Sequence, residues 1–269
     1  MYNKLKIVVL AKQVPDTRHV GKNAMKEDGT VNRAALPAIF NPEDMNALEQ
    51  ALRMKERYPN VTVELLTMGP ARAVDIIREG LFRGADGGIL LTDRKFAGAD
   101  TLATSYALSL AIRKMQPDLV ISGRQAIDGD TAQVGPQVAE KLNWPQVTYA
   151  EEILGIEGEK IVIKRRLEQG VELVSAPLPL VITVHGSAAP CRPRHAKRLL
   201  THKKAQVTEW GVTDVGGDEA QYGLNGSPTR VKKIESVVFQ AKESRRMGAS
   251  EGEINELMQE LINGHTIGG

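Results

Sequence analysis

The sequence predicts an α/β fold: a mostly parallel sheet with helices on both faces. Three observations in the first half of the chain support this prediction. Short and almost fully apolar runs recur, amphipathic helical patterns separate them, and helix start signals stand where those patterns begin. Strands that are buried on both faces have continuous apolar sequences, and helical crossovers make successive strands parallel.

The predicted strands of this sheet are four apolar runs: Leu5–Ala11, Val61–Thr67, Gly88–Leu91 and Asp118–Ser122. Apolar residues at helical spacing predict a helix in each interval between them. The three stripes are Met45, Leu48 and Leu52, then Val74, Ile77 and Leu81, then Leu102, Tyr106 and Leu110. Asn41 before Pro42 predicts the start of the first helix, and Asp100 or Thr101 can cap the third.

The pattern changes after Trp144. Ile161–Arg166 and Val171–Ser175, with Glu168–Gly170 between them, predict a β-hairpin. Leu178–Val184 predicts one more buried strand. We therefore expect residues 1–205 to form the α/β domain.

Residues 206–269 lack core-type patterning, and we expect them to form an extended C-terminal arm. It contains two strand-like pieces at Gln206–Trp210 and Val231–Gln240, a turn-rich stretch at Gly223–Pro228 and a short helix at Ile254–Ile262. An arm that cannot bury enough apolar surface by itself needs another surface to offset its ordering entropy. We expect a partner subunit to supply that surface.

The composition restricts the class of protein. Hydrophobic residues make up 42% of the 269 residues and aromatic residues 4%, so the core is mainly aliphatic. A net charge of +2, with both signs interspersed, gives no general attraction to nucleic acid or to an anionic membrane. Cys191 is the only cysteine, which excludes intramolecular disulfides and cysteine-cluster metal sites and fits a reducing compartment. No apolar run approaches the roughly 18 residues of a membrane span, and the strand pattern that begins at Leu5 leaves no room for a secretory peptide, so we expect a soluble cytoplasmic protein.

Four loops follow the predicted strands: Lys12–Asp16, Met68–Pro70, Phe96–Thr104 and Gly123–Pro136. In parallel sheets ligands bind beyond the carboxyl ends of the strands. The sequence therefore predicts a ligand-binding crevice made from these loops.

The last loop, GRQAIDGDTAQVGP, is the most informative. Asp130 and Gln133 have the spacing of a capping box, and a helix start of this kind presents N–H groups to an anion. Glycines such as Gly129 allow left-handed backbone or close approach to a ligand. However, Asp128 and Asp130 would repel a phosphate unless they cap the helix or accept hydrogen bonds from ribose. The loop is neither a Walker A loop nor a Gly-x-Gly-x-x-Gly turn, so a capped helix without a ligand remains an alternative.

Two shorter motifs are equally ambiguous. Asn41–Asp44 is either a helix cap or a site where the Asn41 amide reads a base or flavin edge. Asp100–Thr104 is either a cap or a pair of hydroxyls placed for phosphate oxygens. The five histidines are scattered, and Cys191 with His195 lacks an oxyanion hole, so we assign no catalytic residue and no metal site.

Residues 191–204 contain six Lys or Arg and no acid. Nucleic-acid binding is disfavoured because no aromatic side chain is available for stacking. A basic loop with an apolar tip is typical of protein docking, and a solvated basic face is the alternative. The docking candidates are Arg194, Leu199, Leu200, Lys203 and Lys204.

Together these stretches resemble a known family, the small (beta) subunit of electron-transfer flavoproteins. The resemblance covers most of the chain. It rests on Lys12–Asp16, Asn41-Pro42-x-Asp44 with Ala47–Glu49, Met68–Pro70, Gly123–Gly135, Trp144–Gln146, Pro193–His195 and Gly223–Thr229. The family commonly has Tyr where this chain has His195, so Leu199 or Leu200 takes the place of the usual docking anchor.

The resemblance implies a fold like that of adenine-nucleotide hydrolases, a large (alpha) subunit as partner, and electron transfer to or from an acyl-CoA-type dehydrogenase, as in fatty acid oxidation. It also implies a bound nucleotide. The implied site consists of Leu10, Ala11, Asn41, Pro42, Glu43, Asp44, Met68, Gly69, Asp100, Thr101, Thr104, Gly123, Arg124, Gln125, Ala126, Ile127, Asp128, Gly129, Asp130, Thr131, Ala132, Gln133 and Val134.

Many members of the family hold AMP in this place, and members that bifurcate electrons from NADH hold a second FAD. Gly98–Thr104 is similar to the FAD-holding members, so FAD is the favoured occupant and AMP the alternative. Thr101 and Thr104 would then meet the second phosphate, and Arg124 and Gln125 would lie near the isoalloxazine. The competing hypothesis is a stand-alone adenine-nucleotide-binding protein or hydrolase of similar fold.

Overall fold

The computed structural model describes residues 4–16, 37–229, 246–264 and 266–267. The chain divides into two units, Met1–Lys233 and Ile234–Gly269, which are described separately below.

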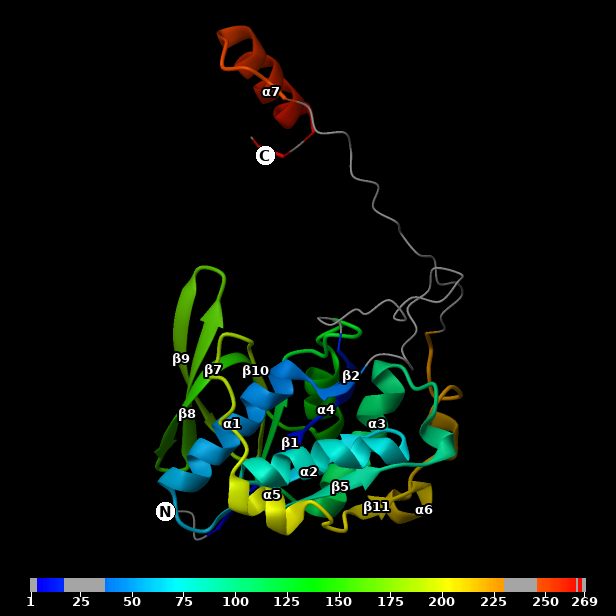
Figure 1. Cartoon of the computed structure of the whole chain (residues 1–269). Coiled ribbons are helices and arrows are strands. Elements are labelled where there is room, and N and C mark those ends of the chain that lie inside the picture. Colours follow the sequence, from blue (N-terminus) through cyan, green and yellow to red (C-terminus); the bar gives the residue numbers. More distant parts are fainter. Residues whose placement is uncertain (1–3, 17–36, 230–245, 265, 268–269) are drawn as a thin grey trace. The chain divides into compact units, whose positions relative to one another are not determined.

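The first unit is built on a nine-stranded sheet (Figure 1). Its strands are β1 (Leu5–Leu10), β4 (Val61–Met68), β5 (Gly87–Leu91), β6 (Leu119–Gly123), β7 (Gln146–Glu157), β8 (Lys160–Leu167), β9 (Gly170–Pro177), β10 (Leu180–Val184) and β11 (Thr208–Trp210). Their order is β11-β5-β4-β1-β6-β10-β7-β8-β9. Neighbours from β11 to β7 are parallel, and β7, β8 and β9 are antiparallel. A separate antiparallel pair joins β2 (Gln13–Pro15) to β3 (Ala38–Phe40).

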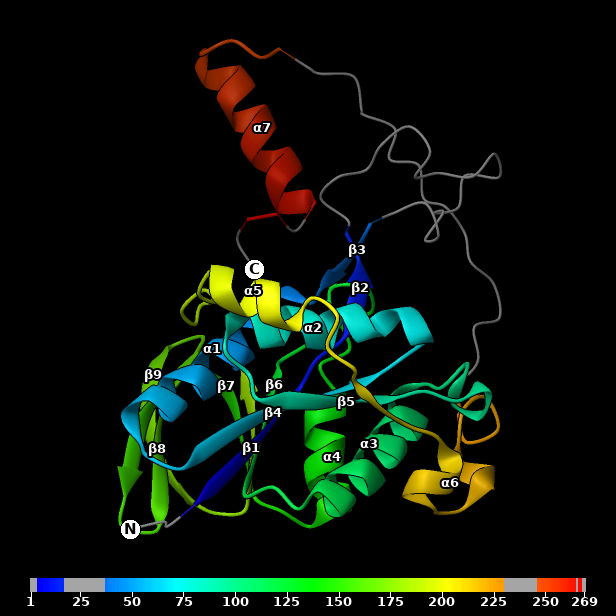
Figure 2. The ribbon, with the colours of Figure 1, turned by 60° about the horizontal axis from the view of Figure 1, so that its bottom comes forward.

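Helices cover both faces of this sheet (Figure 2). One face carries α1 (Pro42–Arg57) and α2 (Val74–Arg83), with α5 (Ala196–His202) against α2. The other carries α3 (Thr101–Met115) and α4 (Val134–Leu142), with α6 (Val212–Val215) beside α3. Short 3₁₀ turns lie at η1 (Ala71–Ala73), η2 (Arg94–Phe96) and η3 (Glu219–Gln221). Alternate residues of one strand serve the two core layers: Ile7 and Val9 pack under α1 and α2, and Val8 packs under α3 and α4.

The strand order places a topological switch point between β1 and β6. From β1 the chain goes to β4 and β5 on one side, and α3 then brings it back to β6 on the other side of β1. The loops after β1 and β6 therefore diverge to opposite faces of the sheet. Such a divergence leaves a crevice at the carboxyl edge, where ligands of open α/β sheets bind.

The predicted fold class is confirmed. The four strands of the first half, the hairpin β8–β9 and the buried strand β10 form where the sequence predicts them. The sequence prediction missed β7, whose residues mix polar and apolar types, and the short strands β2 and β3.

The segment that follows the predicted domain boundary at residue 205 packs on the chain's own sheet. β11 pairs with β5, and Val212, Tyr222 and Ser227 are buried. The Tyr222 ring lies edge-on to Phe96, with ring centroids 5.1 Å apart. The first unit thus includes the predicted strand Gln206–Trp210 and the turn-rich stretch Gly223–Pro228. The other predicted strand, Val231–Gln240, lies outside the described residues. Packing of residues 206–269 on a partner stays a prediction.

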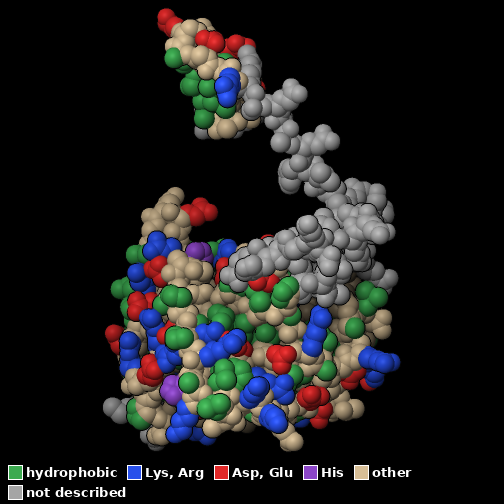
Figure 3. Space-filling view, viewed as in Figure 1, with side chains coloured by type: hydrophobic (Ala, Val, Ile, Leu, Met, Phe, Trp, Pro, Cys, Tyr) green, Lys and Arg blue, Asp and Glu red, His purple; other side chains and the backbone are tan. Residues whose placement is uncertain are grey.

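The second unit contains α7 (Glu251–Asn263), which matches the predicted helix at Ile254–Ile262. Ser250 caps it by accepting a hydrogen bond from the Glu253 N–H. Its large apolar side chains are exposed and gather along one side of the helix in the space-filling view (Figure 3): Ile254, Leu257, Met258 and Ile262.

Lysine, arginine and acidic side chains are interspersed over the visible face of the first unit (Figure 3), as the near-neutral composition predicts. Among the described residues, no helix has the length and apolar character that crossing a bilayer requires.

Candidate functional site

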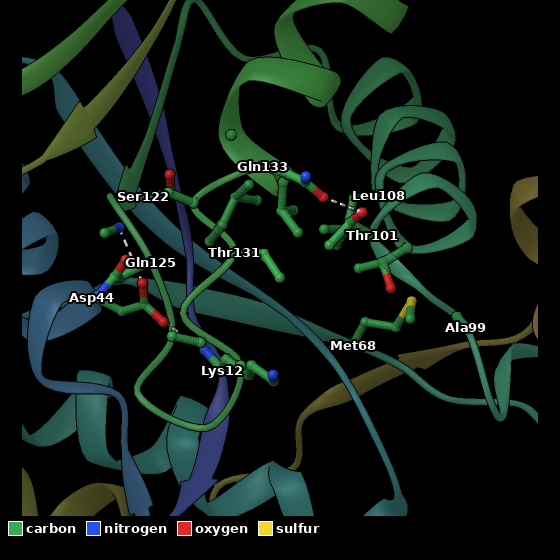
Figure 4. A pocket seen from close by; sticks show the side chains of 18 of the residues that line it. Lys12, Asp44, Met68, Ala99, Thr101, Leu108, Ser122, Gln125, Thr131 and Gln133 are labelled. Carbon is green, nitrogen blue, oxygen red and sulfur yellow. Dashed lines mark hydrogen bonds between the residues drawn. The ribbon is translucent and has the colours of Figure 1, made fainter. Parts of the chain in front are cut away.

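A cavity of about 420 Å³ lies at the switch point. This volume is within the range of about 300–1,000 Å³ that is usual for ligand pockets. The ends of β1, β4 and β6 and the starts of α3 and α4 form its walls. Figure 4 shows Thr101 and Leu108 of α3 on one side, Asp44 of α1 on the other, and Thr131 and Gln133 between them.

Most of the predicted site residues line this cavity. They are Leu10, Ala11, Asp44, Met68, Asp100, Thr101, Thr104, Gly123, Arg124, Gln125, Ala126, Gly129, Asp130, Thr131, Ala132, Gln133 and Val134. Asn41, Pro42, Glu43, Gly69, Ile127 and Asp128 are not in its wall. The structure also places Lys12, Leu66, Phe96, Gly98, Ala99, Leu108, Ser122 and Gly135 there. The sequence offered a signal for some of these, because Lys12, Phe96 and Ser122 lie in or beside the loops expected at the strand ends.

The start of α1 forms hydrogen bonds with the backbone of the cavity loop, Gly123–Pro136. The Asn41 amide donates to the Gln125 carbonyl (2.8 Å) and accepts from the Ile127 N–H (3.2 Å). Glu43 accepts from the Gln125 N–H at 2.9 Å. Asn41 occupies the cap position of α1, as predicted, but its side chain makes no capping bond and is fully buried. Its amide therefore shapes the loop rather than facing the cavity.

Asp44 ties the ends of β1 and β6 together. One carboxylate oxygen accepts from the Lys12 N–H and the other from the Gly123 N–H, both at 2.9 Å. Burial is the largest influence on this group and raises the pKa of Asp44 to about 7, against the opposing effect of these hydrogen bonds. This carboxyl group thus lies in the cavity wall with a pKa close to neutral pH.

The loop enters α4 differently from the prediction. Asp130 and Ala132 both have left-handed backbone, with φ of 48° and 53°, so the helix begins only at Val134. The predicted capping box of Asp130 and Gln133 is therefore wrong. Asp130 accepts from the Gln125 side chain (2.9 Å), and Gln133 stands at the cap position without a side-chain capping bond.

This arrangement leaves donors facing the cavity. The first N–H groups of a helix have no partner within the helix, and the Gln133 side chain at the cap position of α4 does not accept from them. Pro136 has no N–H, so the free donors of this first turn are those of Val134 and Gly135. Left-handed residues alternating with others turn successive N–H groups toward one concave side, as in anion-binding nests. The Ser122 hydroxyl, at the end of β6, is buried and has no hydrogen-bond partner among the described residues. The cavity wall can therefore accept an anionic or hydrogen-bond-accepting group.

The start of α3 is capped, as predicted. Asp100 accepts from the Leu102 and Ala103 N–H groups at 3.0 Å. Although burial opposes it, these bonds and Thr229 lower the pKa of Asp100 below its usual value. The Thr101 hydroxyl lies 2.8 Å from the Gln133 side-chain oxygen, a contact drawn across the cavity in Figure 4. Thr101 thus connects the two helices that border the site.

Gly123 and Gly129, both in the cavity loop, differ in how closely other atoms surround them. A Cβ at Gly123 would lie 2.6 Å from the Asp44 carboxylate and 2.7 Å from the Glu43 backbone, so packing against α1 excludes any side chain. A Cβ at Gly129 would meet no atom of the described residues within 4 Å, and the φ of Gly129 is not in the left-handed region. Of the two reasons expected for a glycine at this position, left-handed backbone does not apply, and close approach to a ligand stays a prediction.

Two cations border the cavity and each has an acidic partner. Lys12 forms a bidentate contact with Asp128 (2.7 and 2.9 Å). The Arg124 guanidinium lies 3.3 Å from Glu43 and 5.6 Å from the centre of the Tyr149 ring. Burial lowers the pKa of Arg124, but hydrogen bonding to Tyr149 and the charge of Glu43 outweigh it and raise that pKa above its usual value.

The basic segment 191–204 is anchored to α1 and α2. Arg192 binds Glu49 through its backbone N–H (3.0 Å) and its guanidinium (2.9 and 3.1 Å), and it also reaches Glu56. Arg194, a predicted docking residue, pairs with Glu79 at 2.9 Å. Leu200 is 78% exposed, Leu199 is half-buried, and Lys203 and Lys204 are exposed. Burial raises the pKa of the Cys191 thiol to about 11, so it is not a reactive thiolate.

The comparison with known proteins settles the family. Residues 28–215 match the electron transfer flavoprotein domain. The chain belongs to the electron transfer flavoprotein family. It is 45% identical over 237 residues to the electron transfer flavoprotein subunit beta of Megasphaera elsdenii, covering 86% of this chain and 87% of that protein.

Two other relatives are named as parts of larger systems. The caffeyl-CoA reductase-Etf complex subunit CarD of Acetobacterium woodii is 44% identical over 228 residues, which are 84% of this chain and 86% of CarD. The acryloyl-CoA reductase electron transfer subunit gamma of Anaerotignum propionicum is 39% identical over 276 residues, covering 98% and 100% of the two chains. The predicted resemblance to the beta subunits is confirmed, and the function of this electron transfer flavoprotein is flavin-associated electron transfer.

Proposed function

We propose that this chain is the beta subunit of an electron transfer flavoprotein and that it binds an adenine nucleotide in the switch-point cavity. FAD is the favoured ligand and AMP the alternative. The observation that carries the proposal is the uncapped start of α4, which faces a cavity of ligand size behind two left-handed residues. A chain without a ligand would gain by capping this helix, since a capping side chain contributes about 1 kcal/mol.

The residues present fit a nucleotide. The N–H groups at the start of α4 and in the Thr131–Val134 stretch suit phosphate oxygens. Those of Gly129 and Asp130 donate instead to the Ala126 carbonyl. Asp130 and Ser122 can bind hydroxyl groups of a ribose, and the apolar side chains of Leu10, Met68 and Leu108 can enclose a flat base. Asp128 is held by Lys12, which reduces its repulsion of a phosphate.

FAD is favoured because Thr101 and Thr104 border the cavity opposite the Gly123–Val134 loop. Their hydroxyls can bind a second phosphate if Thr101 turns away from Gln133. A bound flavin would supply the redox chemistry, while the chain binds it, orients it and excludes water. In the electron-bifurcating version of the proposal NADH is the electron donor.

The partners follow from the same family. We propose an alpha subunit as the obligate partner, and an acyl-CoA-type dehydrogenase that docks on Arg194, Leu199, Leu200, Lys203 and Lys204. The acyl-CoA reductase names of two relatives support a dehydrogenase of that class. The exposed apolar side of α7, in the C-terminal arm, fits a surface that the alpha subunit covers. A cytoplasmic location stays a prediction from the single cysteine.

The test is to denature the purified complex and to identify the released nucleotides by chromatography. Two FAD per heterodimer would support the FAD proposal. One FAD with one AMP would place AMP here, and a single FAD with no other nucleotide would refute the nucleotide site. A Thr101→Val variant, which keeps the shape but removes the hydroxyl, should lose FAD more readily than AMP.

A further inference from the structure

Tyr149 has a backbone conformation that bulky residues rarely adopt. Its φ is 59°, within strand β7. The strand is irregular at this point: Ile182 and Val184 of β10 are two residues apart, but their partners Val147 and Ala150 are three apart. The extra residue makes a bulge, and such bulges re-aim side chains. Glycine would adopt this conformation without steric cost, whereas a tyrosine is strained.

The Tyr149 side chain is not held there by burial, because it is 37% exposed. Its ring contacts are instead with two flat polar side chains. The Arg124 guanidinium carbon lies 5.6 Å from the ring centre. The Tyr149 ring also stacks on the His185 ring, with 5.8 Å between the ring centroids and 25° between the ring planes. His185 is in turn 3.0 Å from the Ser187 hydroxyl, which contacts Glu151 at 3.1 Å.

Arg124 connects this stack to the cavity. It lines the cavity wall, and its backbone N–H donates to the Val184 carbonyl at 2.8 Å. Among the described residues its guanidinium forms one ion pair, a long contact of 3.3 Å with Glu43, besides its interaction with Tyr149. The Nε atom is buried and has no hydrogen-bond partner among the described residues. Salt bridging alone therefore does not fix the orientation of this cation.

We propose that Tyr149 is a positioning residue for Arg124: its strained backbone aims the ring at the guanidinium and holds that cation at the cavity wall, where it binds an anionic group of the ligand. This inference rests on the proposed nucleotide binding. The strain persists because the side chain that it orients serves binding rather than folding. A cation over an aromatic face gains most where water is excluded, as at the edge of a filled cavity.

The experiment compares variants of the full chain, purified with its partner subunit and stripped of nucleotide, in calorimetric titrations with AMP and with FAD. Tyr149→Gly removes both the strain and the ring. We expect its Tm without nucleotide to be unchanged or higher, and its affinity for the nucleotide to fall about tenfold. Tyr149→Phe keeps the ring but removes the hydroxyl, which also interacts with Arg124. It should lose at most about threefold in affinity, less than Tyr149→Gly.

Two controls separate positioning from a general structural role. Gln116 also has a left-handed backbone (φ 51°), at the end of α3 and outside the cavity wall. Gln116→Gly should relieve strain without changing the affinity. In an Arg124→Ala background, Tyr149→Gly should have no further effect on affinity, because Tyr149 acts through Arg124.

Equal affinities of the wild type and Tyr149→Gly would overturn the inference, as would an undiminished effect of Tyr149→Gly in the Arg124→Ala background. Should Tyr149→Gly fail to fold, Tyr149→Leu keeps the bulk without the ring and must show the same loss of affinity. A wild type that binds neither AMP nor FAD would refute the proposed function itself, which is a different result.

Discussion

Gly123→Ala and Gly129→Val form a matched pair in one loop, with opposite expected effects. At Gly123 a Cβ would overlap the Asp44 carboxylate at 2.6 Å and the Glu43 backbone at 2.7 Å, and α1 cannot move away without shifting Asp44. Overpacking of this kind costs about 1–3 kcal/mol. The substitution would also weaken the hydrogen bond from the Gly123 N–H to the Asp44 carboxylate. Complete loss of a hydrogen bond to a charged acceptor costs about 1.5–3 kcal/mol. We expect Gly123→Ala to lower the free energy of unfolding by about 2–5 kcal/mol.

For a unit of this size, that loss lowers Tm by about 5–15 °C. At Gly129 the described residues leave open space, so Gly129→Val should change the free energy of unfolding by less than about 0.5 kcal/mol. Its nucleotide content should nevertheless fall, because a side chain there would occupy the room that the proposed phosphate needs.

The assay is thermal and urea unfolding of nucleotide-free protein, followed by circular dichroism, together with the nucleotide content of the protein as purified. Removing nucleotide is necessary because a bound ligand adds stability of its own. A stable Gly123→Ala variant would refute the packing argument. An unstable Gly129→Val variant would do the same, and normal nucleotide content in that variant would remove Gly129 from the ligand site.

Three further predictions concern docking, pH and the C-terminal segment. A Leu199→Ala/Leu200→Ala variant should keep its flavin spectrum but transfer electrons to the dehydrogenase at least about tenfold more slowly, because a few anchor side chains carry most of the binding energy of an interface. Unchanged stopped-flow kinetics would exclude this role, and Leu173→Ala, on the exposed β9, is the control. Burial raises the pKa of Asp44 to about 7 from an ordinary value of 3.8, so the folded chain binds the carboxyl proton more tightly than the unfolded chain does. Protonation of Asp44 therefore contributes fully to the free energy of unfolding below about pH 4, and this contribution is lost as pH rises through 7. Urea unfolding at pH 5 and pH 8 should show a loss in the wild type that is absent from Asp44→Asn, although that variant is less stable at both values because an amide cannot accept both N–H bonds. In limited proteolysis of the isolated chain, Thr208–Tyr222 should resist cleavage because β11 and Tyr222 belong to the first unit. The helix α7 should be protected only when the alpha subunit is present, and protection of α7 without a partner would contradict this prediction.

The sheet could be predicted from sequence because its central strands are buried on both faces, and continuous apolar runs such as Leu5–Leu10 have few alternatives. β7 could not be predicted in this way. Its first half lies inside the sheet, and its second half lies in an antiparallel ribbon with one solvent-exposed face. The sequence QVTYAEEILGIE therefore has neither a continuous apolar run nor a strict alternation.

The residues of the site could be predicted as a set but not in their roles. Asn41 and Gln125 are 84 positions apart, and no local pattern shows that the Asn41 amide binds the backbone of the cavity loop instead of capping α1. The capping box at Asp130 failed for a similar reason. Its spacing is correct, but Asp130 and Ala132 adopt left-handed backbone that only the folded surroundings select.

One helix joins the two surfaces on which electron transfer would depend. At its first turn α1 carries Asp44, which lies in the cavity wall, and three turns later it carries Glu56, which with Glu49 binds Arg192 at the start of the basic segment 191–204. These contacts are separated by about 18 Å along a continuous helix, at about 1.5 Å per residue. A displacement of residues 191–204 by a docked protein would therefore reach the cavity through one continuous helix. If residues 191–204 dock the dehydrogenase, as proposed, this continuous connection would set the distance between the docked protein and the cavity. Electron tunnelling slows exponentially with distance, so the length of α1 would then influence the transfer rate.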